Sequence, residues 1–239
     1  MIVHRSFSAT HAGARRSHNE DSFVDRPDIG LWAVADGAGG HEAGEVASAM
    51  IHTALEDIPP HLGAGQLLAE ARARLLTVHD TLLREAEARG PGVMMASTVA
   101  VLMVRDSFFA LLWAGDSRIY LLRGDTFSQL TRDHSLVQEL VESGQLTADE
   151  AEAHPQANII TRAIGAGEPE LVLDKVTGSI AAGDRFLLCS DGLSKTLSEA
   201  ELAGLLAAPA GVSPSELLVN AALARQVSDN VTAVVVEVV

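Results

Sequence analysis

The C-terminal decapeptide NVTAVVVEVV, residues 230–239, carries an apolar side chain at nearly every position. Successive side chains of a strand point to opposite faces, so a strand of this composition must be covered by other layers on both faces. Four other segments are short, rich in Val, Ile, Leu or Phe and bounded by Gly, Asp or Ser, and therefore also predict strands. They are GLWAVADG, STVAVLMVRDS, FFALLWAGDSRIYLLRGD and GDRFLLCSDG.

Alanine-rich stretches with helical spacing lie between these strands and predict helices over residues 42–55, 64–88, 135–143, 199–207 and 213–226. Asp133 and Ser198 are suitable helix caps, and Thr147 with Glu150 resembles a capping box. The Gly-Asp pair in RGDTF predicts a hairpin turn. The chain is therefore expected to be an α+β protein in which helices and antiparallel strands share one unit.

The chain of 239 residues is long enough for a sizeable core, and we expect one domain over residues 1–239. Residues 144–167 differ from the rest of the chain in composition, because they are polar, with HPQAN in the middle. Loops of this length are usually functional or mobile, so the segment predicts a flap over the body, with an ordinary connecting loop as the alternative.

The formal net charge of −15, from 32 acidic and 17 basic residues, argues against nucleic acid as a partner. Lys175 and Lys195 are the only lysines. An acidic protein can still act on phosphate if carboxylates hold divalent cations that reverse the local sign. The charge therefore favours a metal site over a basic groove.

The single cysteine, Cys189, allows no disulfide within the chain and stands in an apolar run that predicts a buried thiol. The N-terminus is too polar for a secretory signal, and no apolar run has the length of a membrane span. We therefore expect a cytoplasmic protein that does not bind a membrane.

Acidic residues stand where the predicted strands end or begin. Any one of them could be a simple turn former, but carboxylates gathered at one rim repel one another unless a cation neutralises them. The hard oxygen donors favour Mg²⁺ or Mn²⁺ over zinc. Asp36, followed by glycines, is the best residue to bridge two ions, and Gly37 can offer its carbonyl at close approach. The acidic positions are Glu20, Asp21, Asp36, Asp116, Asp191 and Asp229.

Seven motifs follow one another along nearly the whole chain. They are RRSHNEDSF, VADGAGGHEAGEVAS, ASTVAVLMV, WAGDSRIYLLR, LTRDHSLVQELVESGQLTADEAEAHPQANIITRAIG, LLCSDGLSKTLS and SDNVTAVVVE. Their order resembles that of the metal-dependent protein phosphatases of type 2C, and most closely that of the compact bacterial members. Because seven motifs agree in order, the resemblance is specific.

The resemblance implies a four-layer α-β-β-α sandwich, with two central antiparallel sheets flanked by helices and the metal site at one end. It assigns Asp36 as the bridging carboxylate, the Gly37 carbonyl to one ion, and Asp191 and Asp229 to the other. Asp116, with Asp191, is similar to the pair that holds a third and weaker ion. Glu20 and Asp21 match positions that reach metal-bound waters.

Two further residues acquire roles from the resemblance. Arg16 matches the arginine that binds phosphate, with Arg15 as the neighbouring alternative, and His41 matches the histidine that protonates the leaving alkoxide. On the residues alone, Arg16 could be a surface arginine and His41 could cap the following helix. His134 has no comparable support, and we expect it to be a polar loop residue.

The resemblance implies a serine/threonine phosphoprotein phosphatase in which metal-activated water attacks phosphorus directly, reversing the action of a bacterial Ser/Thr kinase that governs a secretion or envelope system. Two alternatives are a non-catalytic phosphoprotein-binding scaffold of the same fold and a phosphatase of sigma-factor regulators. The first predicts lost carboxylates, although every matching position is filled. We expect phosphorylated proteins as partners and, without an obvious interface in the sequence, a monomer.

Overall fold

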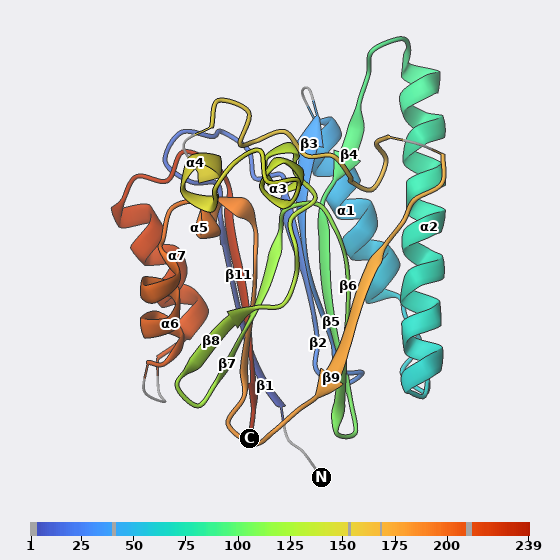
Figure 1. Ribbon diagram of the computed structural model, residues 1–239. Helices are drawn as coiled ribbons and strands as arrows, with labels where there is room; N and C mark the ends of the chain where they lie inside the picture. Colours follow the sequence, from blue (N-terminus) through green and yellow to red (C-terminus); the bar gives the residue numbers. More distant parts are fainter. Residues whose placement is uncertain (1–3, 40–41, 153, 168, 209–211) are drawn as a thin grey trace.

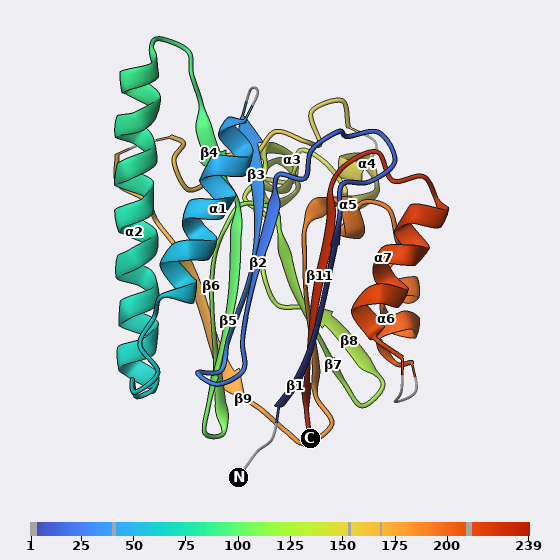
Figure 2. The same ribbon diagram turned by 180° about the vertical axis from the view of Figure 1, so that it is seen from behind.

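The structure, a computed structural model, describes residues 4–39, 42–152, 154–167, 169–208 and 212–239. Two antiparallel sheets face each other and helices cover their outer surfaces, as Figures 1 and 2 show from opposite sides. The four-layer α-β-β-α architecture expected from the resemblance is confirmed. Of the helices in the described parts, none combines the length and apolar character that crossing a membrane requires.

The first sheet has the strand order β1-β11-β10-β7-β8, made of β1 (His4–His11), β11 (Val231–Val238), β10 (Arg185–Cys189), β7 (Arg118–Arg123) and β8 (Thr126–Gln129). The second has the order β2-β3-β5-β6-β9, made of β2 (Asp21–Arg26), β3 (Leu31–Gly39), β5 (Val99–Arg105), β6 (Phe108–Ala114) and β9 (Asp174–Ser179), with β4 (Met95–Ser97) paired to β3.

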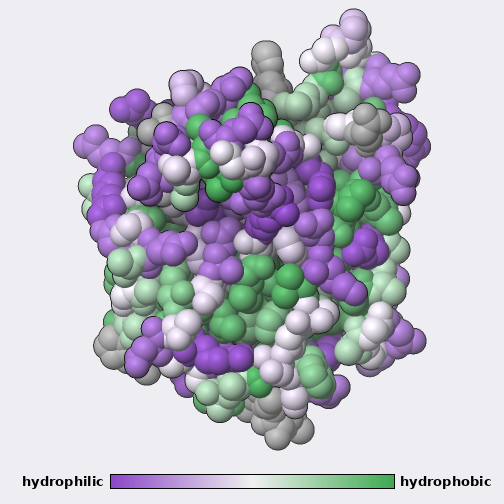
Figure 3. Space-filling model, in the orientation of Figure 1, coloured by the Kyte–Doolittle hydropathy of each residue, from purple (hydrophilic) through white to green (hydrophobic). Residues whose placement is uncertain are grey.

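Helices α1 (Ala43–Glu56) and α2 (Ala64–Arg89) cover the second sheet, and α5 (Asp191–Ser194), α6 (Glu199–Leu206) and α7 (Pro214–Ala224) cover the first (Figure 1). Helices α3 (Leu136–Glu142) and α4 (Ala148–Glu152) lie at the end of the sandwich that is uppermost in Figure 1. Hydrophilic side chains gather across this upper part of the face in Figure 3, whereas a hydrophobic area lies below its centre.

Strand β11 shows why the layers form. Val234, Val236 and Val238 pack in the apolar layer between the two sheets, whereas Val231 and Val235 pack in the layer between the first sheet and its helices. All five side chains are at most 2% exposed. The prediction that both faces of this strand are covered is confirmed, and the period of two in the strand explains the alternation.

The five predicted helices and the Gly-Asp hairpin turn are confirmed. Thr147 and Glu150 form the expected reciprocal bonds at the start of α4, where the Thr147 amide donates to the Glu150 carboxylate at 2.8 Å. Cys189 is buried, as expected, and burial raises the pKa of its thiol to about 12.

The cap expected at Asp133 is wrong. Ser135 caps α3 instead, because its hydroxyl accepts a hydrogen bond from the Gln138 amide at 3.3 Å. Asp133 accepts two hydrogen bonds from Arg118 Nε, each 3.0 Å long, and one from its Nη2 at 2.7 Å. A largely buried guanidinium needs a counter-charge, and this requirement outweighs the capping preference of Asp133.

Candidate metal centre

The acidic residues predicted to meet do lie at one rim of the sandwich. Asp21 opens β2 and is the cross-strand partner of Asp36 near the end of β3. Asp116 follows the end of β6 by two residues, Asp191 follows β10 and begins α5, and Asp229 precedes β11 by two residues. These strand ends share the end of the sandwich that is uppermost in Figure 1. Antiparallel pairing thus brings together carboxylates that are far apart in the chain.

The backbone of Asp36 is held from both sides. Its amide donates to the Thr98 hydroxyl at 3.1 Å, and its carbonyl accepts from the Thr98 amide at 2.8 Å and from the Ser97 hydroxyl at 3.0 Å. Burial raises the pKa of the Asp36 carboxyl, and the neighbouring carboxylates, Asp21 and Asp191 first among them, raise it further. A cation at this position would remove the repulsion.

Asp21 is satisfied on one oxygen only. Its Oδ2 accepts hydrogen bonds from the Ser190 hydroxyl at 2.8 Å and the Thr232 hydroxyl at 2.6 Å, whereas its buried Oδ1 has no hydrogen-bond partner. Burial raises the pKa of this carboxyl to about 7 against the lowering effect of the two hydroxyls. A buried carboxylate oxygen without a partner is costly unless something else binds it.

Gly37 leaves no room for a side chain. A Cβ atom built there would lie 2.2 Å from the Gly44 carbonyl oxygen and 2.7 Å from that of Glu20. The Gly37 amide donates to the same Glu20 carbonyl at 3.1 Å. The backbone at Gly37 therefore packs directly against the backbone of Gly44 and Glu20. A residue without a side chain can also bring its own carbonyl close to a ligand.

Asn230 arranges the loop that carries Arg16. Its side-chain amide donates to the carbonyls of Ala12 and His18, at 3.0 and 2.9 Å, and its oxygen accepts from the Glu20 amide at 2.8 Å. Sequence analysis missed this residue, although it stands beside Asp229 in the SDN motif. Asn230 therefore fixes both ends of the segment from residue 12 to residue 20.

Arg16 lies at the exposed edge of this rim. Its Nη2 donates to Asp229 Oδ2 at 2.9 Å, and 52% of its side chain is exposed. Asp229 raises the pKa of the guanidinium. An exposed guanidinium is suited to bind a phosphate dianion. Arg15 is also exposed.

Lys195, which sequence analysis assigned no role, lies among these carboxylates. Its ammonium donates to Asp191 Oδ2 at 2.7 Å, to Asp116 Oδ2 at 3.1 Å and to Asn158 Oδ1 at 3.0 Å. Burial alone would lower the pKa of Lys195, but the two carboxylates outweigh burial and hold it above its usual value. The position four residues after Asp191 was the available signal, because such residues share one face of a helix.

The residues fit hard divalent cations. The donors are carboxylate and backbone oxygens, which Mg²⁺ and Mn²⁺ prefer, and Asp21 Oδ1 and Asp116 Oδ1 are buried without hydrogen-bond partners. Within the described ranges, no three His, Cys, Asp or Glu side chains converge on one ion. Two of the carboxylates are paired with cations instead, Asp229 with Arg16 and Asp191 with Lys195. Metal binding by Asp229 would therefore require Arg16 to move aside, whereas Lys195 contacts Asp191 through Oδ2.

Of His41 and His134, only His134 lies among the described residues. His41 lies outside the described residues, so its role stays a prediction. His134 lies in the loop between β8 and α3, as expected, but it is buried. It is 7% exposed, stacks on Trp113 with ring centroids 6.1 Å apart, and its Nδ1 accepts a hydrogen bond from the Gly115 amide at 3.1 Å. His134 therefore anchors the residue that precedes Asp116.

We expect His134 to stay neutral, with its Nε2 3.1 Å from Arg162 Nη1 and 3.3 Å from Asp174 Oδ2. Burial and then Arg162 lower the pKa of His134 against the effect of Asp174. The folded-state pKa of His134 lies below its unfolded value, so folding favours the neutral ring. The free energy of unfolding that depends on the neutral ring is fully present above about pH 6.5 and is lost as the pH falls through the folded pKa. NMR titration of the ring should give a midpoint below 6.5. A midpoint above that value would contradict the assignment.

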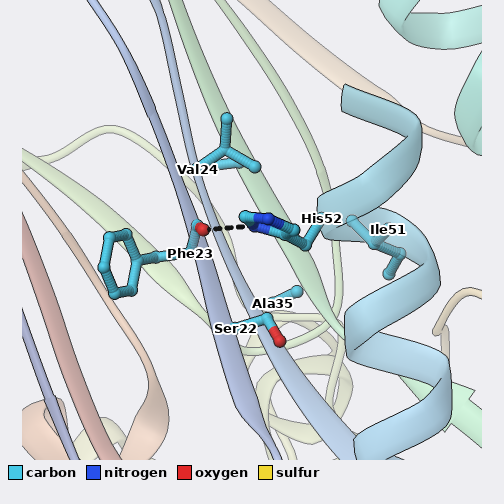
Figure 4. Close-up of a pocket in the computed structure, with 7 residues that line it drawn as sticks. Ser22, Phe23, Val24, Ala35, Ile51 and His52 are labelled. Carbon is cyan, nitrogen blue, oxygen red and sulfur yellow. Dashed lines mark hydrogen bonds between the residues drawn. The ribbon is translucent and has the colours of Figure 1, made fainter. Parts of the chain in front are cut away.

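A separate crevice lies between α1 and β2 (Figure 4). It is lined by Ser22, Val24, Ala35 and Ile51, among others, and has no room for a water molecule. His52 Nδ1 is 2.7 Å from the Phe23 carbonyl oxygen, which fixes the helix to the strand. This crevice is a packing contact.

Comparison with known proteins agrees with this geometry. The family model for protein phosphatase 2C matches residues 10–228. The serine/threonine protein phosphatase PstP of Mycobacterium tuberculosis is 37% identical over 238 residues, which cover all of this chain and 46% of that relative. This chain thus spans about half the length of that relative.

Two solved structures are similar over their full length. PppA, described as a key regulatory component of T6SS in Pseudomonas aeruginosa, superposes with a TM-score of 0.91 at 40% identity and covers 99% of this chain and 98% of its own. The catalytic domain of PstP in complex with two manganese ions gives a TM-score of 0.89 at 34% identity, with complete coverage of both chains.

Proposed function

The chain belongs to the protein phosphatase 2C family, and from this membership we propose that it is an Mg²⁺- or Mn²⁺-dependent phosphatase of phosphoserine and phosphothreonine in proteins. One observation carries the proposal: the carboxylate rim keeps two buried oxygens without hydrogen-bond partners, on Asp21 and Asp116, and at its exposed edge the guanidinium of Arg16 pairs with Asp229. A scaffold without catalysis would have no reason to keep so many carboxylates together, because each costs free energy when it is unpaired.

We assign the ligands of two core ions as follows. Asp36 would hold both ions, the Gly37 carbonyl would hold one, and Asp191 and Asp229 would hold the other. Glu20 and Asp21 would bind waters held by the ions. Support comes from the backbone approach at Gly37 and from the related structure with two manganese ions. When bound, such ions lower the pKa of water and neutralise charge on phosphoryl oxygens.

The chain's own residues orient the substrate. Arg16 would donate two parallel hydrogen bonds to the phosphate, leaving Asp229 free for metal. Hydrogen bonds from Asn230 hold the loop that carries Arg16, so little conformational entropy is lost when the phosphate binds. His41 would give a proton to the leaving serine or threonine oxygen, and this assignment rests on the sequence alone.

The segment 144–167 is proposed as the flap of one catalytic domain that spans the whole chain. It includes α4 and Asn158, whose side-chain oxygen is 3.0 Å from Lys195 Nζ at the rim. The flap also pairs with the body, because the Leu136 amide donates to the Ile159 carbonyl at 2.9 Å. Such contacts would make the flap one wall of the substrate groove.

The substrates are proposed to be phosphoproteins, and the opposing enzyme to be a Ser/Thr kinase in the cytoplasm. Control of a secretion system is the specific role that the likeness to PppA favours. The net charge of −15 should make basic phosphopeptides better substrates than acidic ones. The catalytic unit is proposed to act as a monomer.

Phosphate release from a phosphothreonine peptide tests the function. The chelator-treated full chain should be inactive, and activity should return as Mn²⁺ or Mg²⁺ is added. Asp191→Asn should stay inactive at ion concentrations that saturate the wild type. Turnover that survives chelation would contradict the proposal, as would tight phosphopeptide binding without release at saturating Mn²⁺.

Replacing Arg16 should affect catalysis and leave stability nearly unchanged. Arg16→Ala should lower kcat/KM for a phosphopeptide about a hundredfold, because two charge-assisted hydrogen bonds are lost. The melting temperature should hardly move, since the pair with Asp229 is exposed. Arg15→Ala is the matched control and should change kcat/KM less than about threefold. The reverse order of effects would assign phosphate binding to Arg15.

A further inference from the structure

Lys195 is one of only two lysines in the chain, and its ammonium has a complete set of partners. An ammonium has three N–H donors, and three oxygens surround this one at 2.7, 3.1 and 3.0 Å, from Asp191, Asp116 and Asn158. The partners come from α5, from the end of β6 and from the segment 144–167. The ammonium therefore joins three parts of the rim as a small cation would.

The local backbone fixes this position. Lys195 directly follows α5, and its amide donates to the Asp191 carbonyl at 2.8 Å, so the two side chains leave the same face of the helix. The helix packs directly on the chain before β11, where a Cβ atom at Gly192 would lie 2.0 Å from the Asn230 carbonyl oxygen. The helix therefore cannot turn its lysine away without breaking that contact.

Asp116 is equally constrained. Its side chain is 3% exposed, and the preceding residue, Gly115, donates to His134 and accepts from the His134 amide, at 3.1 and 2.9 Å. A carboxylate so buried requires a positive partner. Among the described residues, the ion pair that the structure gives Asp116 is the one with Lys195.

We propose that the Lys195 ammonium takes the place of the third divalent ion, so that this chain holds two metal ions and supplies the third cation itself. The proposal rests on the proposed function, because it presupposes the two core ions. Asp116 and Asp191 are the carboxylates to which the resemblance assigns a third ion, and both already bind the ammonium. A divalent ion between them would meet the repulsion of a positive charge held within hydrogen-bond distance of the same oxygens.

The consequence concerns metal dependence. A third ion held by few protein oxygens binds weakly, at about millimolar concentration, and its occupancy follows the surroundings. A lysine is part of the chain and is always present. The contact with Asn158 would therefore hold the segment 144–167 against the rim whatever the metal concentration.

Mn²⁺ binding to the chelator-treated full chain, measured by equilibrium dialysis with metal analysis, tests the proposal. The wild type should bind two ions per chain, and Lys195→Met should bind a third at about millimolar Mn²⁺. Lys195→Arg keeps the charge and should bind two, as should the control Lys175→Met, which alters an exposed lysine on β9.

Two results would overturn the proposal alone: a wild type that binds three ions, or a folded Lys195→Met that still binds two. A wild type that binds fewer than two ions would instead overturn the metal centre of the proposed function and this proposal with it. The number of ions bound by the wild type thus separates the two failures.

The unaltered protein gives a second test that does not depend on the folding of a variant. Labelling with ¹⁵N-lysine should give two ammonium signals. At saturating Mg²⁺, the Lys195 signal should stay protected from exchange with water, because all three donors keep their partners, whereas the exposed Lys175 should exchange fast. If Mg²⁺ makes Lys195 exchange as fast as Lys175, the ion has displaced the ammonium and the proposal is wrong.

Discussion

Asp36→Asn is expected to lower phosphatase activity at least about a hundredfold and at the same time to stabilise the chelator-treated protein. The loss of activity follows because an amide cannot neutralise two ions, and removal of one preorganised charge from a catalytic site typically costs that much. The gain in stability of the chelator-treated protein follows because burial and the neighbouring carboxylates raise the pKa of Asp36. The ionised form of Asp36 therefore opposes folding at neutral pH.

The expected stabilisation is about 1 kcal/mol near pH 7, or about 2–4 °C in melting temperature for a chain of this length. Its size depends on pH. A carboxyl whose folded-state pKa is raised makes the wild type lose stability as the pH rises above the unfolded value of about 4. The variant lacks that loss, so the difference should shrink towards pH 4.

The measurement is the melting temperature of the wild type and of Asp36→Asn, each with chelator and with Mn²⁺. Mn²⁺ should raise the melting temperature of the wild type much more than that of Asp36→Asn, because a ligand stabilises only the state that binds it. Equal stabilisation by Mn²⁺ would show that Asp36 does not contact the ions. A chelated variant that melts below the chelated wild type would contradict the argument from repulsion.

Gly37→Ala is expected to destabilise the fold by about 3 kcal/mol and to abolish metal binding. The added methyl group would lie 2.2 Å from the Gly44 carbonyl oxygen and 2.7 Å from the Glu20 carbonyl oxygen. Both contacts are with backbone, which cannot rotate aside as a side chain can, so β3 or α1 must move. The movement would displace the Gly37 carbonyl and Glu20 together.

Gly65→Ala is the matched control. Gly65 lies in the first turn of α2, where a Cβ atom would meet nothing within 4 Å. Alanine should stabilise this helix by about 0.5–1 kcal/mol, since glycine loses more backbone entropy on folding. Urea unfolding of the three proteins gives the comparison. If Gly37→Ala were as stable as the wild type and still bound Mn²⁺, the close approach would have no role in metal binding.

The sequence was least informative at the edges of the two sheets. Strand β1, HRSFSATH, is an edge strand whose residues are half-buried or exposed, and β9, DKVTGS, is the edge of the other sheet. Sequence analysis expected neither strand. Their few apolar side chains give a weak local signal, and pairing with β11 and β6 supplies the hydrogen bonds that make them strands.

The sequence by itself determined the layered fold and the carboxylates of the site. The apolar residues at nearly every position of β11 require cover on both faces, and acidic residues next to strand ends must lie at one end of the sheets or the other. The motif order was enough to indicate the family and to single out Asp36, Asp191 and Asp229.

Only the tertiary structure decided which side chains meet. Lys195 and Asp116 form an ion pair although 79 positions separate them. His134, in the loop before α3, accepts a hydrogen bond from Gly115, which follows β6. Asn230 donates hydrogen bonds to a loop near the opposite end of the chain. A local pattern reports burial and turns, because these depend on neighbouring residues. Pairing between distant polar groups depends on strand order and register, so the position of Lys195 among the carboxylates became apparent only when the sheets were assembled.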